Sequence, residues 1–534
     1  MNDRAVPPMT TLSRRTLLHW LANGSVASNW PQRAWSHPRF DSNPFALGIA
    51  SGSPTHSGVV LWTRLLQTGH LGRSSLSVIP ISVQWDVAHD EAFARIVRSG
   101  KILALPELAH SVHAEVDGLE PDRWYFYRFQ VGGVQSPVGR TRTLPAPETT
   151  VQRLRLAYAS CQRWEHGHYG AYRHMQRESL DLVLFLGDYI YEYAEAARAV
   201  RTAGTWATTL ETYRDRYALH KSDLALQGMH AQCPWLVTWD DHEVQNDYAG
   251  LHSGQNGPPV ASFAARRAAA YQAYFEHMAL RTSVLTQGLA GMARGAEMRI
   301  YGQHDFGRLA RIFMLDNRQY RDRQACTVDN HTGSSLIYPD QCASLNQAGR
   351  KMLGTMQERW LQKALIGSPG TWNLIGQQTL FGSRLFGKGP ANTVWNDVWD
   401  GYPAARKRVT RLLERMPTLN NVILGGDVHE NWVGHVKADY AKPSSATVGV
   451  EFCGTSITSR GSGSASEAAD ILAANPHFVF ADTQRRGYGV LNITSKRLTA
   501  TLRVVDDVTH AETGIQTLAQ FEMESGKPDL KRTR

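Results

Sequence analysis

Short apolar and alternating runs, bounded by glycine and proline, dominate residues 40–147. Successive side chains on a strand point to opposite faces, so runs of this kind without a helical period predict β-strands. Several short strands in succession favour a β-sandwich. The predicted strands are residues 59–62, 76–79, 81–85, 111–116 and 124–131.

The pattern changes after a proline-containing linker, residues 143–150. Apolar runs now alternate with helical segments, which predicts a layered α/β sheet. The predicted strands are residues 154–159, 180–186, 235–239, 311–315, 373–377 and 422–424. The predicted helices are residues 169–178, 210–218, 261–277, 348–366 and 404–416.

Composition places the chain among globular proteins. It is 42% hydrophobic and 20% charged, which excludes a disordered or collagen-like chain. Its net charge of +9 comes without any long run of lysine and arginine, so we expect no specific nucleic-acid binding. No run reaches the roughly 18 apolar residues that a membrane span needs.

The N-terminus has the features of an export signal. Residues 13–18, Ser-Arg-Arg-Thr-Leu-Leu, precede a weakly apolar stretch, which is typical of a twin-arginine signal. We expect residues 1–36 to be this signal, the twin-arginine machinery to be a partner, and the protein to be periplasmic or secreted. Without these residues the net charge falls to +6. A plain N-terminal tail is the alternative.

Five cysteines are present, an odd number. In an oxidising compartment Cys326 and Cys342 would form a disulfide, and otherwise they are two thiols. Cys233 and Cys453 border apolar runs and are expected to be buried thiols. Cys161 directly follows a predicted strand, where it is either an inert buried thiol or a metal ligand.

Three further polar clusters follow predicted strands, where open α/β sheets bind ligands. Gly187–Glu192 brings Asp188 and Tyr191 together, and their oxygens suit a hard cation such as ferric iron; a turn with packed aromatic rings explains the motif equally well. Residues 240–247 hold four acids, one histidine and one asparagine, which favours a metal site with His242 for acid–base work.

The last cluster is Asp427-x-His429 after the strand at 422–424. On an extended segment these two side chains share a face, so they can hold one metal ion. A polar turn is the alternative. All four clusters are predicted at the same edge of the sheet.

The ordered motifs resemble the PhoD-like alkaline phosphatases and phosphodiesterases, a branch of the calcineurin-like metallophosphoesterases. The resemblance runs from Phe45–Gly52 and Gly58–Arg64 to the end of the catalytic region. It also includes the four clusters and the motifs at 315–321, 357–361, 399–403 and 452–456. It implies an N-terminal β-sandwich, fibronectin- or immunoglobulin-like, over 40–147 and a layered αββα metallophosphoesterase domain over 150–510. The lysines and arginines between Lys527 and Arg534 predict that the chain closes with a C-terminal tail over 511–534. Residues 119–125 are also similar to the tyrosine corner of fibronectin type III domains, in which the tyrosine hydroxyl bonds back to the main chain.

The same resemblance implies a site for ferric iron and calcium. Cys161, Asp188 and Tyr191 would bind iron, with His429 or Asp427 completing its shell. Asp188 would bridge to calcium, which Asn246, Asp427 and Asp241 would also hold. Ser160-Cys161-Gln162 replaces the usual Asp-x-His opening of the superfamily, and Asp241-His242-Glu243 replaces its Asn-His-Asp/Glu box.

The implied reaction is hydrolysis of a phosphate ester, in which a metal-bound hydroxide attacks and His242 assists the leaving group. Arg318 either contacts phosphate or pairs with acids, and we favour the pairing. A phosphodiesterase or phospholipase-D-like activity at the same site is the first alternative. An envelope-binding module with structural metals is the second. Phosphate-ester turnover that a chelator abolishes and calcium restores would distinguish an enzyme from a binding module.

Overall fold

This computed structural model describes residues 40–66, 79–197, 199–255, 257–285, 297–327, 333–387, 392–416, 420–461 and 463–534. The predicted signal, residues 1–36, and most of the predicted strand at 76–79 lie outside the described residues. No helix within the described ranges is long and apolar enough to cross a membrane.

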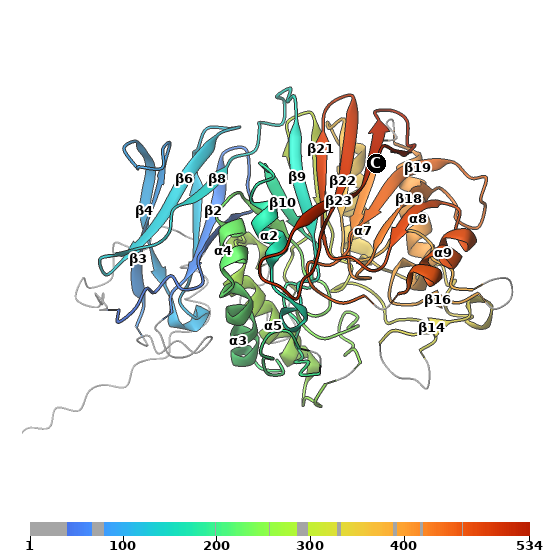
Figure 1. Cartoon of the computed structure of the whole chain (residues 1–534), viewed down its shortest axis with the longest axis horizontal. Helices are drawn as coiled ribbons and strands as arrows, with labels where there is room; N and C mark the ends of the chain where they lie inside the picture. Colours follow the sequence, from blue (N-terminus) through green and yellow to red (C-terminus); the bar gives the residue numbers. More distant parts are fainter. Residues whose placement is uncertain are drawn as a thin grey trace, which may run out of the picture.

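Two large sheets face each other across a common core (Figure 1). The ten-stranded sheet has the order β24-β23-β22-β21-β9-β10-β11-β1-β2-β5, and the seven-stranded sheet has the order β12-β13-β15-β17-β19-β18-β20. Strands of the first are β1 (Ile49–Gly52), β2 (Gly58–Arg64), β5 (Ser111–Asp117), β9 (Leu154–Ala159), β10 (Leu182–Phe185), β11 (Trp235–Val237), β21 (Gly487–Ile493), β22 (Arg497–Val505), β23 (Ile515–Glu524) and β24 (Lys531–Arg532). Strands of the second are β12 (Gly302–Phe306), β13 (Ala310–Met314), β15 (Trp372–Gly376), β17 (Asn421–Gly425), β18 (Asn431–Lys437), β19 (Thr447–Cys453) and β20 (Phe478–Asp482).

The continuous apolar runs of the central strands are explained by burial of both faces. In β10, Leu184 points into the core between the sheets, whereas Phe185 packs under helices on the outer face. In β13, Ile312 and Phe313 divide in the same way. The chain is therefore a mixed α/β protein, as the sequence predicts, and its six central strands divide between two sheets.

Helices cover the outer faces of both sheets. The ten-stranded sheet is covered by α2 (Gly170–Met175), α3 (Leu210–Lys221), α4 (Leu224–His230) and α5 (Phe263–His277). The seven-stranded sheet is covered by α7 (Gly354–Ile366) and α8 (Pro403–Glu414). A further helix, α9 (Ala465–Ala474), precedes β20, and the short strands β14 (Leu336–Ile337) and β16 (Val394–Trp395) pair with each other.

The N-terminal strands form a second core at one end of the large sheet. A five-stranded sheet packs against β1, β2 and β5 through Val59, Val83 and Tyr127, among others. Its strands are β3 (Ile81–Ala88), β4 (Ile96–Ala104), β6 (Trp124–Val131), β7 (Val134–Gln135) and β8 (Gly139–Arg142). Tyr125 Oη accepts a hydrogen bond from Glu120 N at 2.9 Å, so the predicted tyrosine corner is confirmed. Because β1 pairs in parallel with β11, the large sheet crosses the boundary predicted near residue 147.

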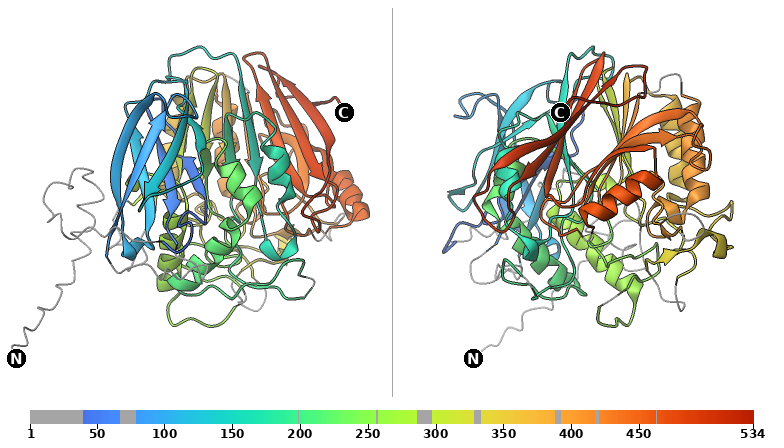
Figure 2. Two further views of the ribbon diagram at one scale, coloured as in Figure 1. Left: turned by 60° about the vertical axis from the view of Figure 1, so that its left-hand side comes forward. Right: turned by 45° about the vertical axis from the view of Figure 1, so that its right-hand side comes forward.

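The C-terminal segment was predicted wrongly. Residues 511–534 were expected to be a tail, but β23 pairs along its length with β22 at the other end of the large sheet (Figure 2). Ala519, Phe521 and Met523 alternate into the core between the sheets, which gives this strand its stability. The lysines and arginines near the chain end favour an exposed tail, whereas the alternating apolar residues before them favour a strand.

Candidate metal centre

The candidate site is built where parallel strands of both sheets end. Cys161 follows β9, Asp188 follows β10 and Asp241 follows β11, all in the ten-stranded sheet. Asp427 follows β17 of the facing sheet. Gly187 makes the turn after β10 possible, because its φ is +110° and a Cβ there would lie 2.5 Å from Asp240 Cβ.

Four of the ligand candidates, and Asp247 beside them, share an uncommon backbone conformation. Cys161, Asp188, Asp247, Asp427 and His429 all have left-handed φ values, between 57° and 66°. Non-glycine residues persist in this region only where the surrounding structure holds them, and such residues gather at functional sites. The prediction that Asp427 and His429 lie on one face of an extended segment is therefore wrong, since both residues are in turns.

The first half of the site consists of Cys161, Asp188, Tyr191 and His429, and we call it the cysteine–tyrosine group. Ligand atoms of Cys161, Asp188 and His429 lie within 4.8 Å of one another. The Tyr191 hydroxyl donates to Asp188 Oδ2 at 2.9 Å and lies 3.0 Å from His429 Nε2. His429 Nδ1 donates to the Arg460 carbonyl at 2.8 Å, which orients Nε2 toward Tyr191 and Asp188.

Burial controls protonation in the cysteine–tyrosine group. It raises the pKa of the Cys161 thiol well above its usual value, and the nearby Asp188 carboxylate raises it further. The pKa of Tyr191 is raised well above its usual value by the same two causes. Without a cation both groups are neutral. A highly charged cation reverses this preference, because it stabilises thiolate and phenolate directly.

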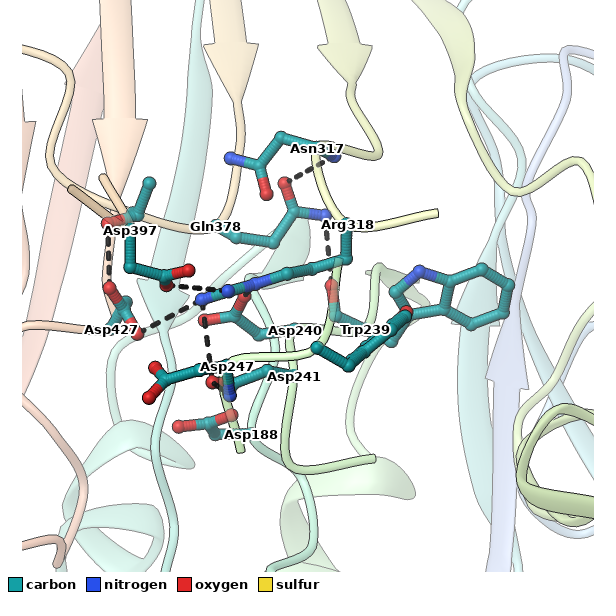
Figure 3. A network of polar contacts seen from close by, with 12 residues as sticks. Asp188, Trp239, Asp240, Asp241, Asp247, Asn317, Arg318, Gln378, Asp397 and Asp427 are labelled. Carbon is teal, nitrogen blue, oxygen red and sulfur yellow. Dashed lines mark hydrogen bonds and ion pairs between the residues drawn. The ribbon is translucent and has the colours of Figure 1, made fainter. Parts of the chain in front are cut away.

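The second half surrounds Arg318, and we call it the aspartate cage. Its members are Asp240, Asp241, Asp247, Asp397 and Asp427 (Figure 3). The Arg318 side chain is fully buried and hydrogen-bonds to Asp240, to Asp397 at 2.6 Å and to Asp427 at 3.4 Å. It therefore pairs with acids, as the sequence analysis favoured.

The aspartate cage contains more carboxyl groups than guanidinium groups. Burial raises the pKa of Asp427 to about 6 and that of Asp247 to about 7, with neighbouring aspartates adding to the rise. Burial also opposes the charge of Asp241, but Arg318 and His242 outweigh it and hold that pKa below its usual range. Arg321 joins the cage through Asp397 at 2.8 Å, so two guanidinium groups face five carboxyl groups.

Unpartnered oxygens point to a bound cation. Asp188 Oδ1, Asp240 Oδ2 and Asp241 Oδ1 are buried without a hydrogen-bond partner among the described residues. A buried carboxylate oxygen without a donor is costly, and a cation removes this cost. The donors therefore fit metal ions: oxygen donors for a hard cation in the cage, and thiolate, phenolate and imidazole beside it.

His242 lies between the two halves. Its Nδ1 donates to Glu192 Oε2 at 2.8 Å, and its ring centroid lies 4.1 Å from that of Tyr191. Burial opposes protonation of this ring, but Asp241, Asp188 and Glu192 outweigh it and raise its pKa well above the usual value. These carboxylates therefore favour the protonated form of the His242 ring.

A cleft of about 790 Å³ opens over these groups. Asp188, Asp241, His242, Asn246, Asp427 and His429 all line it. Asn246 Nδ2 donates to Asp247 Oδ2 at 2.7 Å, so the amide carbonyl remains available. Cys161 and Tyr191 are buried beside Asp188 and complete the set of predicted residues.

Sequence reasoning missed three residues that shape the site. Glu192 orients His242. It is the last residue of the polar motif after β10, so the sequence does indicate that it lies near the site. The buried carboxylate of Glu243 accepts the main-chain N–H groups of Asp188, Tyr189 and Asp240, which ties two loops together. Asp397 follows the two-residue strand β16, and no apolar run marks that position.

Comparison with known proteins identifies relatives over most of the chain. The family model of the PhoD-like phosphatases matches residues 156–502, and that of their N-terminal domain matches residues 31–145. Alkaline phosphatase D of Bacillus subtilis (strain 168) is 44% identical over 504 residues, which are 93% of this chain and 83% of that protein. A solved structure of PhoD shares 43% identity with a TM-score of 0.86 and covers 93% of both chains.

Proposed function

We propose, from the premise that the chain belongs to the PhoD-like phosphatase family, that its cleft hydrolyses phosphate esters at a site for two unlike cations. Membership makes the chain a hydrolase with PhoD-like alkaline phosphatase function, which sets aside the envelope-binding module. The observation that carries the two-cation proposal is the set of buried carboxylate oxygens of Asp188, Asp240 and Asp241 without partners.

Donor chemistry supports a division of the site between the two cations. Cys161, Asp188, Tyr191 and His429 would hold ferric iron, because thiolate and phenolate ligands suit a highly charged ion. Asp188, Asp241, Asn246 and Asp427 would hold calcium through oxygen atoms. Asp188 belongs to donor groups with Cys161 and with Asp241, which supports a bridging role.

The remaining expectations about architecture and export are part of the same proposal. The layered helices and sheets are those of the αββα metallophosphoesterase domain, and the N-terminal strands form a fibronectin-like sandwich. Residues 1–36 direct twin-arginine export to the periplasm or the medium. Export of a folded protein suits an enzyme that takes up its metal ions before it leaves the cytoplasm.

The chain's own residues would bind the ester and handle the proton of the leaving group. When bound, the cations neutralise phosphate oxygens and lower the pKa of water at the site. His242 lines the cleft and its Nδ1 is held by Glu192, so its other ring nitrogen would pass a proton to the departing alkoxide. Glu243 and Arg318 are not among the residues that line the cleft, and they would position the loops that carry Asp188 and Asp240.

Turnover of p-nitrophenyl phosphate tests this proposal. We expect hydrolysis that a chelator abolishes and added calcium restores. Asp188→Asn should remove nearly all activity, whereas Asp439→Asn, at a surface pair with Lys407, should leave it unchanged. Full activity of Asp188→Asn, or of the chelated enzyme, would contradict the proposal.

A further inference from the structure

Helices α7 and α8 cover the outer face of the seven-stranded sheet and leave a groove between them (Figure 2). The groove has a volume of about 500 Å³, and its floor includes the apolar side chains of Leu361 and Leu412. Its walls carry five basic side chains, those of Lys351, Arg359, Arg408, Arg411 and Arg415. None of these residues lines the cleft of the metal centre, so this α7–α8 groove is a separate surface.

Most of the positive charge in the α7–α8 groove has no acidic partner. Glu358, the acid that lines the groove, is bound by the guanidinium of Arg408 at 2.7 and 2.9 Å. Glu414 is exposed on α8, and Asp322 accepts the main-chain N–H of Lys351 at 2.9 Å. Among the residues that the structure describes, no ion pair or side-chain hydrogen bond engages the other four cations, Lys351, Arg359, Arg411 and Arg415.

An exposed stripe of α7 runs along this groove. Its members, Met356, Arg359, Lys363 and Ile366, follow one another at intervals of three or four residues, which places them on one side of the helix. All four are exposed, Met356 at 72% and Ile366 at 64%. Exposed apolar side chains at both ends of a basic stripe are typical of a helix face that lies at the surface of a bilayer, where cations meet lipid phosphates and apolar side chains enter the acyl boundary.

We propose that the α7–α8 groove and the α7 stripe dock the protein on a membrane surface that contains anionic phospholipids. Lipid phosphates are bound among Arg359, Arg411 and Arg415, because a guanidinium pairs with phosphate oxygens through two parallel hydrogen bonds. A free phosphate compound would satisfy the same charges but would leave Met356 and Ile366 exposed to water. A lipid surface accounts for both the cations and the apolar side chains. The inference concerns a surface apart from the cleft and does not depend on the proposed function.

Cosedimentation of the full-length, metal-loaded protein with lipid vesicles tests the proposal, in buffer without added calcium. The vesicles contain phosphatidylcholine alone or an equal mixture of phosphatidylcholine and phosphatidylglycerol. We expect the wild type to bind the mixed vesicles and not the neutral ones. The triple variant Arg359→Glu, Arg411→Glu, Arg415→Glu should bind the mixed vesicles at least about 100-fold more weakly, since each cation near an anionic surface contributes about fivefold. The double variant Met356→Ser, Ile366→Ser should bind about tenfold more weakly.

Two matched variants control for charge and for apolar exposure in general. Arg153→Glu, Arg177→Glu, Lys496→Glu changes the net charge by the same amount at exposed positions beside the ten-stranded sheet. Leu224→Ser removes a side chain that is 79% exposed at the start of α4. Both controls should bind the mixed vesicles as the wild type does.

Turnover of p-nitrophenyl phosphate and the midpoint of urea unfolding should be the same in all these variants as in the wild type. Absence of vesicle binding by the wild type, equal binding by the triple variant, or an equal loss in its charge-matched control would overturn the inference. So would tripolyphosphate binding that the triple variant loses when the wild type binds no vesicles, since the ligand would then be a free phosphate compound. If the wild type hydrolyses no phosphate ester, the proposed function fails, while vesicle binding still decides this inference.

Discussion

The two halves of the candidate metal centre neutralise their acids in different ways. The aspartate cage contains its own cation, since Arg318 bonds to Asp240, Asp397 and Asp427. In the cysteine–tyrosine group Asp188 has no arginine partner within the described residues; its basic neighbours are histidines, His429 at 3.9 Å and His242. The cage can therefore fold before any metal ion arrives, whereas the other half needs a highly charged ion to ionise its thiol and phenol.

Removal of Arg318 should cause the largest loss of stability. It tests whether this arginine stabilises the aspartate cage in the absence of a metal ion. Arg318→Met leaves buried carboxylates without a counter-ion, so we expect a loss of about 3–5 kcal/mol in the unfolding free energy of metal-free protein. Urea unfolding measures it. Asp188→Asn should cost little in the same buffer, because it removes a charge that has no arginine partner.

Arg123→Met is the matched control for Arg318, since Arg123 forms an exposed pair with Glu120 and should cost less than about 1 kcal/mol. Metal-free Arg318→Met protein as stable as the wild type would show that the cage does not depend on its arginine.

The disulfide Cys326–Cys342 should affect the aspartate cage alone. The segment it closes contains Ser334, whose hydroxyl donates to Asp247 Oδ2 at 2.7 Å, and just before it Gln324 Nε2 donates to Asp397 Oδ1 at 2.6 Å. The double variant Cys326→Ser, Cys342→Ser should lose about 3 kcal/mol of stability and bind calcium more weakly.

Iron binding is the discriminating readout for the disulfide. It should be the same in the double variant as in the wild type, and dithiothreitol should have no further effect on the variant. A loss of iron that equals the loss of calcium would contradict the separation of the two halves.

Tyr191→Phe tests the cysteine–tyrosine group. The ring still packs, but the phenolate ligand is gone, so activity should fall by about 10- to 100-fold while stability changes little. The visible absorption band expected of iron bound to phenolate should disappear. Tyr193→Phe is the control, as its ring also lies near His242, with centroids 5.4 Å apart. An unchanged band in Tyr191→Phe would exclude Tyr191 as a ligand.

The pH dependence of calcium binding should follow the ionisation of carboxyl groups in the aspartate cage. Burial raises the pKa of Asp247 to about 7 and of Asp427 to about 6, so both are protonated in acid when no cation is bound. A carboxyl group with a raised folded-state pKa stabilises the fold at low pH, and this contribution is lost as the pH rises from about 4 to about 7. Calcium needs the ionised form, so its affinity should rise about tenfold per pH unit in the upper part of this window.

The shift in melting temperature on adding calcium, measured from pH 5 to pH 8, checks this expectation. Glu451→Gln is the control, because burial also raises the pKa of Glu451 to about 7 while its carboxylate accepts hydrogen bonds from Phe381 and Gly382 on a different loop. This variant should change how the melting temperature depends on pH, but the shift in melting temperature on adding calcium should stay the same. A calcium effect independent of pH would contradict the cage as the binding site.

Local patterns predicted the central strands well, and they placed the ligand candidates at one edge of the fold. The strand at 154–159 matches β9, and each predicted metal ligand lies in or beside the cleft because parallel strands end together. The division into two sheets could not come from spacing alone, since strands of either sheet have the same apolar runs. Asp397 was missed because its position depends on pairing between β14 and β16, far apart in the chain.

Two other differences have a backbone origin. Asp427 and His429 adopt left-handed φ values in place of the expected extended segment. Asp and His are enriched in this conformation, but the enrichment does not identify which of them in a sequence will adopt it. Spacing alone cannot decide between a disulfide and two separate thiols; the structure joins Cys326 and Cys342 in a disulfide.

Metal content of three purified proteins tests the central claim most directly. Elemental analysis of the wild type, Tyr191→Phe and Asn246→Ala should find iron and calcium in the first. Tyr191→Phe should lack iron and retain calcium, and Asn246→Ala should retain iron and lack calcium. Absence of both metals from active wild-type protein, or loss of both from each variant, would contradict a centre made of two unlike halves.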